Sequence, residues 1–211
     1  MSTSIRPSWT DNAAVVALAT LALNGVSRAT LDLSIKFGAY LILQAAKKGT
    51  TALTNGVDVI VRRTVNAGGI VHPGEWFHGL MDAPASQVTT INVDVALGAT
   101  TLNVVATASW AAGDVGVISD GADGAGDLSR VEWFRVARVT DATHLLIDAP
   151  TQFAHTAAQA DKVRNKAAAF PPLWCPGGAK YEVIFDYGDD AAGESVLVRA
   201  LAQTYDLDMV T

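Results

Sequence analysis

The alternation of apolar and polar residues is interrupted in this chain, and the interruption limits the folds open to it. Two flanking regions, residues 28–65 and 179–206, carry the period-two pattern of half-buried strands. The pattern is clearest in Leu31–Phe37, Val57–Val61 and Lys180–Phe185. The stretch between them has its own rhythm of short strands and turns. The sequence therefore predicts an all-β fold, in which a jelly-roll or Greek-key-like β-sandwich domain is interrupted by an inserted small β-barrel module.

The predicted organisation has three parts. Residues 1–12 form an N-terminal arm, which is polar but carries Pro7 and Trp9. Residues 13–85 together with 166–211 form the discontinuous sandwich domain. Residues 86–165 form the insertion, which returns to the sandwich through Pro171-Pro172.

The segment Ala13–Leu23 is compatible with two structures. Asp11 or Asn12 is a suitable cap for a short alanine-rich helix. The alternation of Val16 and Leu18 instead fits a strand, with Asn24-Gly25 as a hairpin turn into the next strand. We expect the strand.

Later strands are expected over residues 39–44 and 57–65, and the short connections favour a meander or a Greek-key sandwich. Residues 66–84 differ, because glycine, proline and aromatic residues dominate them, and we expect an irregular loop that makes contacts. The last strands are expected at Tyr181–Phe185 and Ser195–Ala202. Closely spaced strands in the insertion fit a small barrel, and they are expected at Leu102–Ala106, Val115–Ile118, Arg130–Val139 and His144–Asp148.

Composition excludes several classes of protein. Of 211 residues, 50% are hydrophobic and 17% are charged, which suits a packed core or a surface that a partner covers. The net charge is −6 and no basic cluster exceeds two residues, so we expect no nucleic-acid partner. The single cysteine, Cys175, excludes an intrachain disulfide and is expected to be a small apolar core residue.

We expect no targeting signal in this sequence. The first seven residues lack the charged start and apolar run of a signal peptide. The apolar stretch Ala13–Leu23 has only about half the length needed to cross a bilayer. We expect synthesis in a cytoplasm and no membrane partner.

Candidate metal and catalytic groups are few. His72, Glu75 and His78 lie in one segment, but their spacing and the Pro-Gly interruption fit a zinc site poorly. Asp120–Asp127 has the glycine and aspartate of a calcium loop, yet these residues also make ordinary turns. A second acidic loop, at Asp186, Asp189 and Asp190, fits a solvated turn. No nucleophile elbow or phosphate-binding loop is present, so we expect neither an enzyme nor a cofactor.

Five tryptophans are available for binding. They could line a sugar platform, but mid-strand Trp133 and proline-flanked Trp174 are more typical of core or interface anchors. The five are Trp9, Trp76, Trp110, Trp133 and Trp174.

The insertion resembles a small β module of tailed-bacteriophage virion proteins. The resemblance rests on Gly98–Val104, Trp110–Ile118, Glu132–Val139, Thr143–Pro150 and Phe153–Ala157, in the order turn, strand, Gly-Asp, strand, Arg-Val strand, Leu strand, apolar-Ala-His. Only the Gly/Asp loop 119–129 is longer than in that module. The flanking segments Ala29–Leu41 and Asn55–Arg63 resemble sheet segments of phage capsid-associated proteins.

The resemblance implies a non-enzymatic virion protein, most specifically a capsid decoration (cement) protein on the capsid exterior. Its partners would be the major capsid protein and further copies of itself, with a trimer expected by analogy. The alternatives are a tail-associated virion protein and a carbohydrate- or receptor-binding module, for which glycan binding lost on Trp110→Ala would be the sign. The expected partner contacts lie in the arm, the aromatic segment and the C-terminus: Arg6, Trp9, His72, Trp76, Phe77, Met81, Leu207 and Met209.

Overall fold

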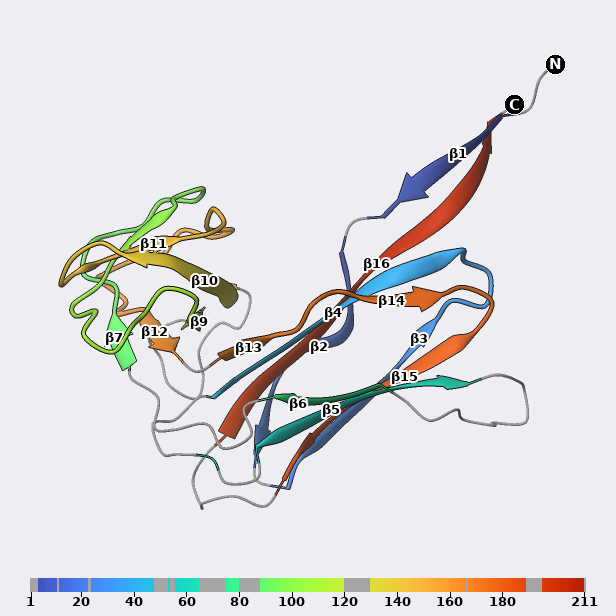
Figure 1. The fold of residues 1–211 in the computed structure, drawn as a ribbon, viewed down its shortest axis with the longest axis horizontal. Helices are drawn as coiled ribbons and strands as arrows, with labels where there is room; N and C mark the ends of the chain where they lie inside the picture. Colours follow the sequence, from blue (N-terminus) through green and yellow to red (C-terminus); the bar gives the residue numbers. More distant parts are fainter. Residues whose placement is uncertain are drawn as a thin grey trace.

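The protein is built from β-strands in three antiparallel sheets (Figure 1). The computed structural model describes residues 4–10, 12–22, 24–47, 53, 56–64, 75–79, 88–119, 130–165, 167–188 and 195–210. Within these ranges there is no α-helix. The predicted all-β class, a sandwich-type fold with a barrel-like module, is confirmed.

The first sheet is organised around one long C-terminal strand. Its six strands are β1 (Ser4–Trp9), β2 (Ala13–Ala22), β4 (Gly38–Lys47), β13 (Ala167–Ala169), β14 (Leu173–Pro176) and β16 (Ser195–Val210). Along one edge β16 pairs with β2 and then with β1, and along the other edge it pairs with β4. The far edge of β4 pairs with β13 and β14. The alanine-rich segment is therefore a strand, as expected.

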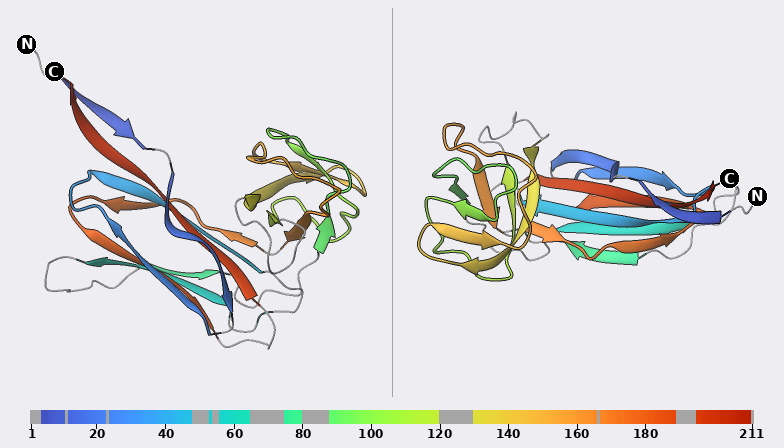
Figure 2. Two further views of the ribbon diagram at one scale, coloured as in Figure 1. Left: turned by 180° about the vertical axis from the view of Figure 1, so that it is seen from behind. Right: turned by 90° about the horizontal axis from the view of Figure 1, so that it is seen from above.

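The second sheet lies against the first and completes a sandwich (Figure 2). Its order is β3 (Val26–Asp32), β15 (Lys180–Tyr187), β5 (Val57–Thr64) and β6 (Glu75–Gly79). Alternate residues of both sheets fill the space between them, among them Leu41, Leu43, Val59, Val183 and Phe185, which are fully buried. Cys175 belongs to this core, as the sequence predicts.

From β2 to β5, and again from β14 to β16, consecutive strands alternate between the two sheets, which corrects the expected hairpin. Asn24 has a positive φ of 57° and makes a turn, but β2 pairs with β16, whereas β3 pairs with β15. The Asn-Gly turn therefore carries the chain across the sandwich instead of joining paired neighbours. An Asn-Gly pair tolerates positive φ both in a hairpin and in a turn between two sheets, so it does not determine which strands pair. The crossing is that of a Greek-key-like sandwich and excludes a meander.

The third sheet curls on itself. Its order is β7 (Val88–Thr90), β12 (Lys162–Asn165), β9 (Val115–Ser119), β10 (Glu132–Val139), β11 (His144–Ile147) and β8 (Thr101–Asn103). An isolated bridge between Ile91 and Val104 joins the ends of β7 and β8, which are the first and last strands of this order. The enclosed core includes Leu102, Phe134 and Leu145. We call this unit the module.

A strand lies within the segment that the sequence predicts to be an irregular loop, and another lies within the predicted arm. Residues 75–79 form the edge strand β6, with Trp76 opposite Ile60 and Phe77 opposite Val59, so they are not part of an irregular loop. The pairing of β6 with β5 satisfies the backbone hydrogen-bonding groups of residues 75–79. In the sequence, the neighbouring glycine and proline residues hide this strand. Within the arm, β1 pairs with the end of β16, from Ser4 opposite Val210 to Trp9 opposite Tyr205. The division into domains stays a prediction.

Candidate interaction surface

The outward side of the first sheet, which we call the outer face, is unusually apolar for a surface. On β4 and β16, alternate residues such as Leu41 and Ala202 point into the core. The residues between them lie on the outer face, where Ile42 is opposite Leu201 and Tyr40 is opposite Gln203. Trp174 on β14 lies opposite Tyr40. We define the outer patch as Phe37, Tyr40, Ile42, Trp174, Leu201 and Tyr205.

Two aromatic pairs organise the outer patch. The rings of Tyr40 and Trp174 have centroids 5.0 Å apart, and those of Phe37 and Tyr205 meet edge-on at 5.1 Å. Trp174 lies over Gly38, since a Cβ added there would be 2.4 Å from its ring. The aromatic residues stay open to solvent: Tyr40 is 40% exposed, Trp174 37% and Phe37 53%. Pre-formed aromatic pairs with this exposure are typical of partner contacts.

Beyond the outer patch, the first sheet narrows to two strands that project from the sandwich and carry both chain termini at their tip (Figure 1). We call this two-stranded part, Ser4–Trp9 with Tyr205–Val210, the ribbon. Its backbone register runs from Ser4 opposite Val210 to Trp9 opposite Tyr205.

At its other end the outer face is covered by the module. Ala46 and Leu197 of the sandwich form a small buried cluster with Val117 and Val131 of the module. Trp133 packs against this cluster and donates a hydrogen bond from Nε1 to the Ala45 carbonyl oxygen at 3.2 Å. The outer face therefore has a covered end at the module and an uncovered end at the outer patch and ribbon.

Arg199 fixes this junction. Its guanidinium carbon lies 4.7 Å from the centre of the Trp133 ring, a cation–π contact. Its Nε and Nη2 both donate to Oε1 of Gln44, at 2.8 and 2.7 Å. Burial lowers the pKa of the guanidinium below its usual value, and the Glu132 carboxylate opposes that shift. The group remains a cation because its starting pKa is so high.

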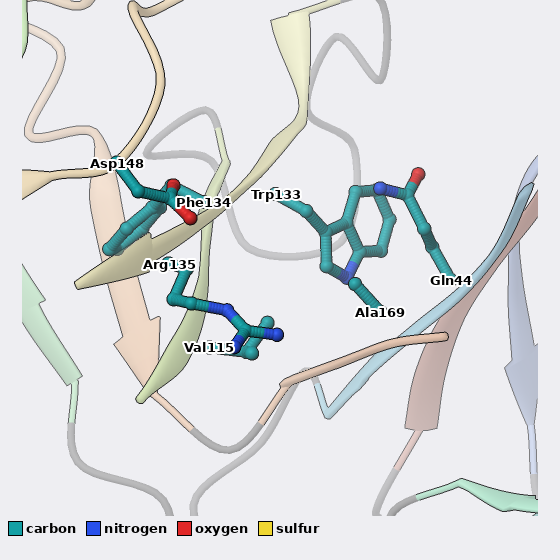
Figure 3. A pocket seen from close by; sticks show the side chains of 7 residues that line it. All are labelled: Gln44, Val115, Trp133, Phe134, Arg135, Asp148 and Ala169. Atoms are coloured by element: carbon teal, nitrogen blue, oxygen red, sulfur yellow. The ribbon is translucent and has the colours of Figure 1, made fainter. Parts of the chain in front are cut away.

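A small cleft opens beside the junction (Figure 3). Its volume is about 190 Å³, and its lining comprises Gln44, Val115, Trp133, Phe134, Arg135, Asp148 and Ala169. This volume is below the roughly 300–1,000 Å³ of ordinary ligand pockets. Trp133 already bonds to Ala45 across the junction, Gln44 accepts from Arg199 of its own sheet, and the lining contains no nucleophile next to a base. The cleft therefore has the size and lining of a packing gap beside the junction.

A buried acidic pair holds the one fully buried histidine of the described part. His155 Nε2 lies 2.6 Å from Glu132 Oε1, and Nδ1 lies 3.2 Å from Asp161 Oδ2. The backbone N–H groups of Gln152 and Thr156 donate to the same two carboxylates. The three side chains are at most 6% exposed, so solvent and substrates do not reach them. This network therefore ties the chain around residues 152–161 to β10.

The other described histidine closes a turn. Asp141 accepts hydrogen bonds from the Thr143 and His144 backbone N–H groups and contacts His144 Nδ1 at 2.9 Å. The Thr143 backbone N–H, followed by the His144 side chain, lowers the pKa of the Asp141 carboxyl to about 2. Among the described residues, no group of three or more His, Cys, Asp or Glu is arranged to hold a metal ion.

The predicted contact residues are distributed over two places. Backbone pairing places Arg6, Trp9, Leu207 and Met209 together in the ribbon. Trp76 and Phe77 lie apart from them, on the edge strand of the second sheet. His72, Met81 and the Asp120–Asp127 loop lie outside the described residues, as do Asp189 and Asp190 of the other acidic loop.

The sequence reading missed the outer patch. In the run Tyr40-Leu-Ile-Leu both faces of β4 are apolar, so the alternation that separates inside from outside is lost. Trp110 was named as a possible sugar ligand, but it is 6% exposed and stacks on Phe134 with centroids 5.6 Å apart. Loss of glycan binding on Trp110→Ala would therefore report a damaged core.

Comparison with known proteins yields no relative. No protein-family model, no curated protein and no solved structure matches this chain. In the described part, no helix is long and apolar enough to cross a membrane.

Proposed function

We propose that this chain is a non-enzymatic structural subunit of a larger assembly, and specifically a decoration protein on the outside of a tailed-bacteriophage capsid. The observation that carries the proposal is the uncovered end of the outer face. Its outer patch keeps three aromatic residues, Phe37, Tyr40 and Trp174, more than a third exposed. Contiguous apolar surface of this kind is characteristic of protein contacts.

The remaining features support a structural role. The polar side chains around Arg199 and around His155 connect parts of the fold, and those around His155 are buried inside it. Groups that are used in this way support a scaffold role. The resemblance of the module and the flanking strands to phage virion proteins gives the assembly its identity, with the major capsid protein as partner.

Binding to capsid shells tests this function. Purified protein is mixed with shells of the phage that encodes it, stripped of the protein, and the mixture is sedimented. We expect saturable co-sedimentation and a higher temperature of DNA release from decorated particles. Trp174→Ser should weaken binding because the outer face is buried in the assembly, while Leu97→Ser, at a site 67% exposed on the module, should not.

Failure to co-sediment with shells, together with binding to purified tails, would replace the decoration role by a tail-associated one. Binding to a glycan array without binding to either particle part would favour the receptor-binding alternative.

A further inference from the structure

We infer that the outer edge of β3 pairs with the same edge of a second copy of this chain, antiparallel across a two-fold axis, so that the second sheets of two chains form one continuous sheet. The inference goes beyond the proposed function and does not rest on it. It follows from the open edge of β3, from the charges along that edge and from the short side chains of the neighbouring strand β2.

β3 has one occupied edge and one open edge. At one end of the strand, Leu33 N–H donates to the Ala179 carbonyl oxygen at 2.9 Å. At the other end, Tyr187 N–H donates to the Gly25 carbonyl oxygen at 3.0 Å, in the same register of β3 with β15. Because hydrogen-bonded and non-hydrogen-bonded pairs alternate along antiparallel strands, the N–H and C=O groups of the even-numbered residues point away from β15. Within the part of the chain that the structure describes, no strand pairs with this outer edge.

The open edge is long, regular and exposed. The residues that direct their backbone groups outward all have exposed side chains, and they are Val26, Arg28, Thr30 and Asp32. β3 contains no proline, and its seven residues pair with β15 without a register shift. Proteins usually block an exposed edge with proline, a bulge or a very short strand, because it otherwise accepts another strand. This edge has none of those three features, so it is able to accept one.

The charges along the edge favour a second copy as the partner. When two β3 strands run antiparallel with Thr30 on the two-fold axis, Arg28 of each copy lies opposite Asp32 of the other. Opposite-charge pairs and threonine pairs are both favourable across antiparallel strands. An axis at Arg28 or at Asp32 would instead oppose like charges. An axis at Ala29 or at Leu31 would oppose no unlike charges, so the register centred on Thr30 has the best charge complementarity.

Both charged side chains can make the new contact and keep their present ones. Arg28 is 57% exposed and donates to Glu182 through Nη1 at 3.0 Å, which leaves Nε and Nη2 as donors. The hydrogen bond from Lys180, followed by that from Ser34, holds the pKa of the Asp32 carboxyl below its usual range, so Asp32 is charged at neutral pH. Surface ion pairs contribute little energy by themselves. They therefore select the register, while the backbone hydrogen bonds of the new ladder hold the strands together.

The neighbouring strand lets two copies approach closely. The chain passes from β2 into β3 through the Asn24-Gly25 turn, so in the described part β2 ends the first sheet on the same side of the sandwich. β2 is rich in alanine, whose short side chains do not hold two sandwiches apart. A contact along strand edges is smaller than a standard interface, to which each partner contributes roughly 800 Å². We therefore expect a dimer that dissociates on dilution, in place of the trimer expected by analogy.

The first test is the mass of the full-length protein, measured by sedimentation equilibrium over a range of concentrations. We expect a monomer–dimer equilibrium for the wild type. Arg28→Asp and Asp32→Arg should each give the mass of one chain, because like charges then face each other across the axis. An equal mixture of these two variants should regain dimers, since each chain meets the opposite charges of the other.

Arg62→Asp is the matched control. Arg62 also pairs with Glu182, at 2.7 Å, but it lies on β5 inside the sheet, so its substitution should leave the dimer intact. A wild type that stays monomeric at every concentration, a trimer, or a mixture that fails to dimerise would overturn the inference. Loss of the dimer in Arg62→Asp as well would also overturn it.

Two substitutions at Thr30 test the backbone pairing. Thr30→Pro removes an N–H that points away from β15, so the circular dichroism spectrum should be retained and the dimer should be lost. Thr30→Val keeps the N–H and should keep the dimer. A dimer of wild-type affinity in Thr30→Pro would show that the edge does not pair.

Cross-linking tests the register. In Thr30→Cys the two thiols would lie opposite each other with Cα atoms about 5.5 Å apart, within the range of a disulfide. In Val26→Cys, at another exposed site of the same strand face, the register would separate the two Cα atoms by about 27 Å. The native Cys175 is buried, so oxidation should give covalent dimers of Thr30→Cys only. Equal cross-linking in both variants, or none in either, would rule out the register.

This inference and the proposed function fail separately. A dimer that binds no capsid shell would end the decoration role and leave the edge pairing in place. A monomer that binds shells would end the edge pairing and leave the decoration role.

Discussion

Arg199 on the last strand of the sandwich lies over the ring of Trp133 on the module, with 4.7 Å between its guanidinium carbon and the ring centre. The indole N–H of Trp133 reaches back to the Ala45 carbonyl on β4. These contacts join two parts of the fold that have separate hydrophobic cores. Together with the buried cluster of Ala46, Val117, Val131 and Leu197, this pair couples the module to the sandwich.

Removing Trp133 should therefore uncouple the two parts. Trp133→Ala deletes the hydrogen bond, the cation–π contact and part of the junction cluster, and we expect a loss of about 2–3 kcal/mol in unfolding free energy. Calorimetry should show one thermal transition for the wild type and two for the variant. Trp174→Ala serves as the control, and a single unshifted transition in Trp133→Ala would contradict the coupling.

The core of the module should be sensitive to Trp110. It is nearly buried and stacked on Phe134, so Trp110→Ala should cost about 3–5 kcal/mol in urea unfolding. Leu97→Ala, at an exposed site, should change the free energy by less than about 0.5 kcal/mol. Equal effects of the two substitutions would mean that Trp110 is not part of the core.

His155 should be needed for stability because it lies between two buried carboxylates and bonds to both. His155→Ala leaves Glu132 and Asp161 without the group that bonds to both, and we expect a loss of about 3–5 kcal/mol. The double variant His155→Ala/Glu132→Gln should recover part of the loss, since it removes one uncompensated charge. Strictly additive losses in chemical denaturation would argue against a coupled network.

Cys175 should be unreactive in the native protein. Burial raises the pKa of its thiol to about 12, so the thiolate needed for attack is scarce at neutral pH. The raised pKa favours the neutral form in the folded state, so stability should fall as pH rises from the ordinary thiol pKa of 9.0 toward 12. Maleimide labelling should be slow in buffer and complete in urea. Rapid labelling of the native protein would show an open site.

The module should fold by itself if the predicted domain division is correct. The described part of residues 86–165 has a barrel-like core of its own, and it meets the sandwich at the junction cluster and the contacts of Trp133 and Arg199. The isolated fragment should give a dispersed amide NMR spectrum, with improved solubility on Val131→Ser at the former junction. A collapsed spectrum would mean that the sandwich is required for its folding.

The sequence predicts more of the fold than of the interaction surface. Period-two alternation located most strands, as in Val57–Thr64 and Lys180–Tyr187, because one face of each is buried. It did not reveal strand partners: Asn24-Gly25 looked like a hairpin turn, yet it crosses between sheets. The sequence pattern also did not predict that β16 extends to Val210, because only pairing with residues 4–9 makes this tail a strand.

The interaction surface could be predicted only in part. Trp9, Leu207 and Met209 are predicted contact residues, and the pairing of β1 with β16 brings their backbones together in the ribbon. Tyr40 and Trp174 are far apart in sequence and meet only because β14 pairs with β4. Their surroundings are apolar on both faces of the strand, which hides an exposed aromatic pair from any pattern of alternation.

Antibody–gold labelling of intact, purified virions tests the central claim most directly. Gold spread over the head would agree with a decoration protein on the capsid exterior, which is the result that this account predicts. Gold confined to the tail, or particles that contain no trace of the protein by mass spectrometry, would contradict it.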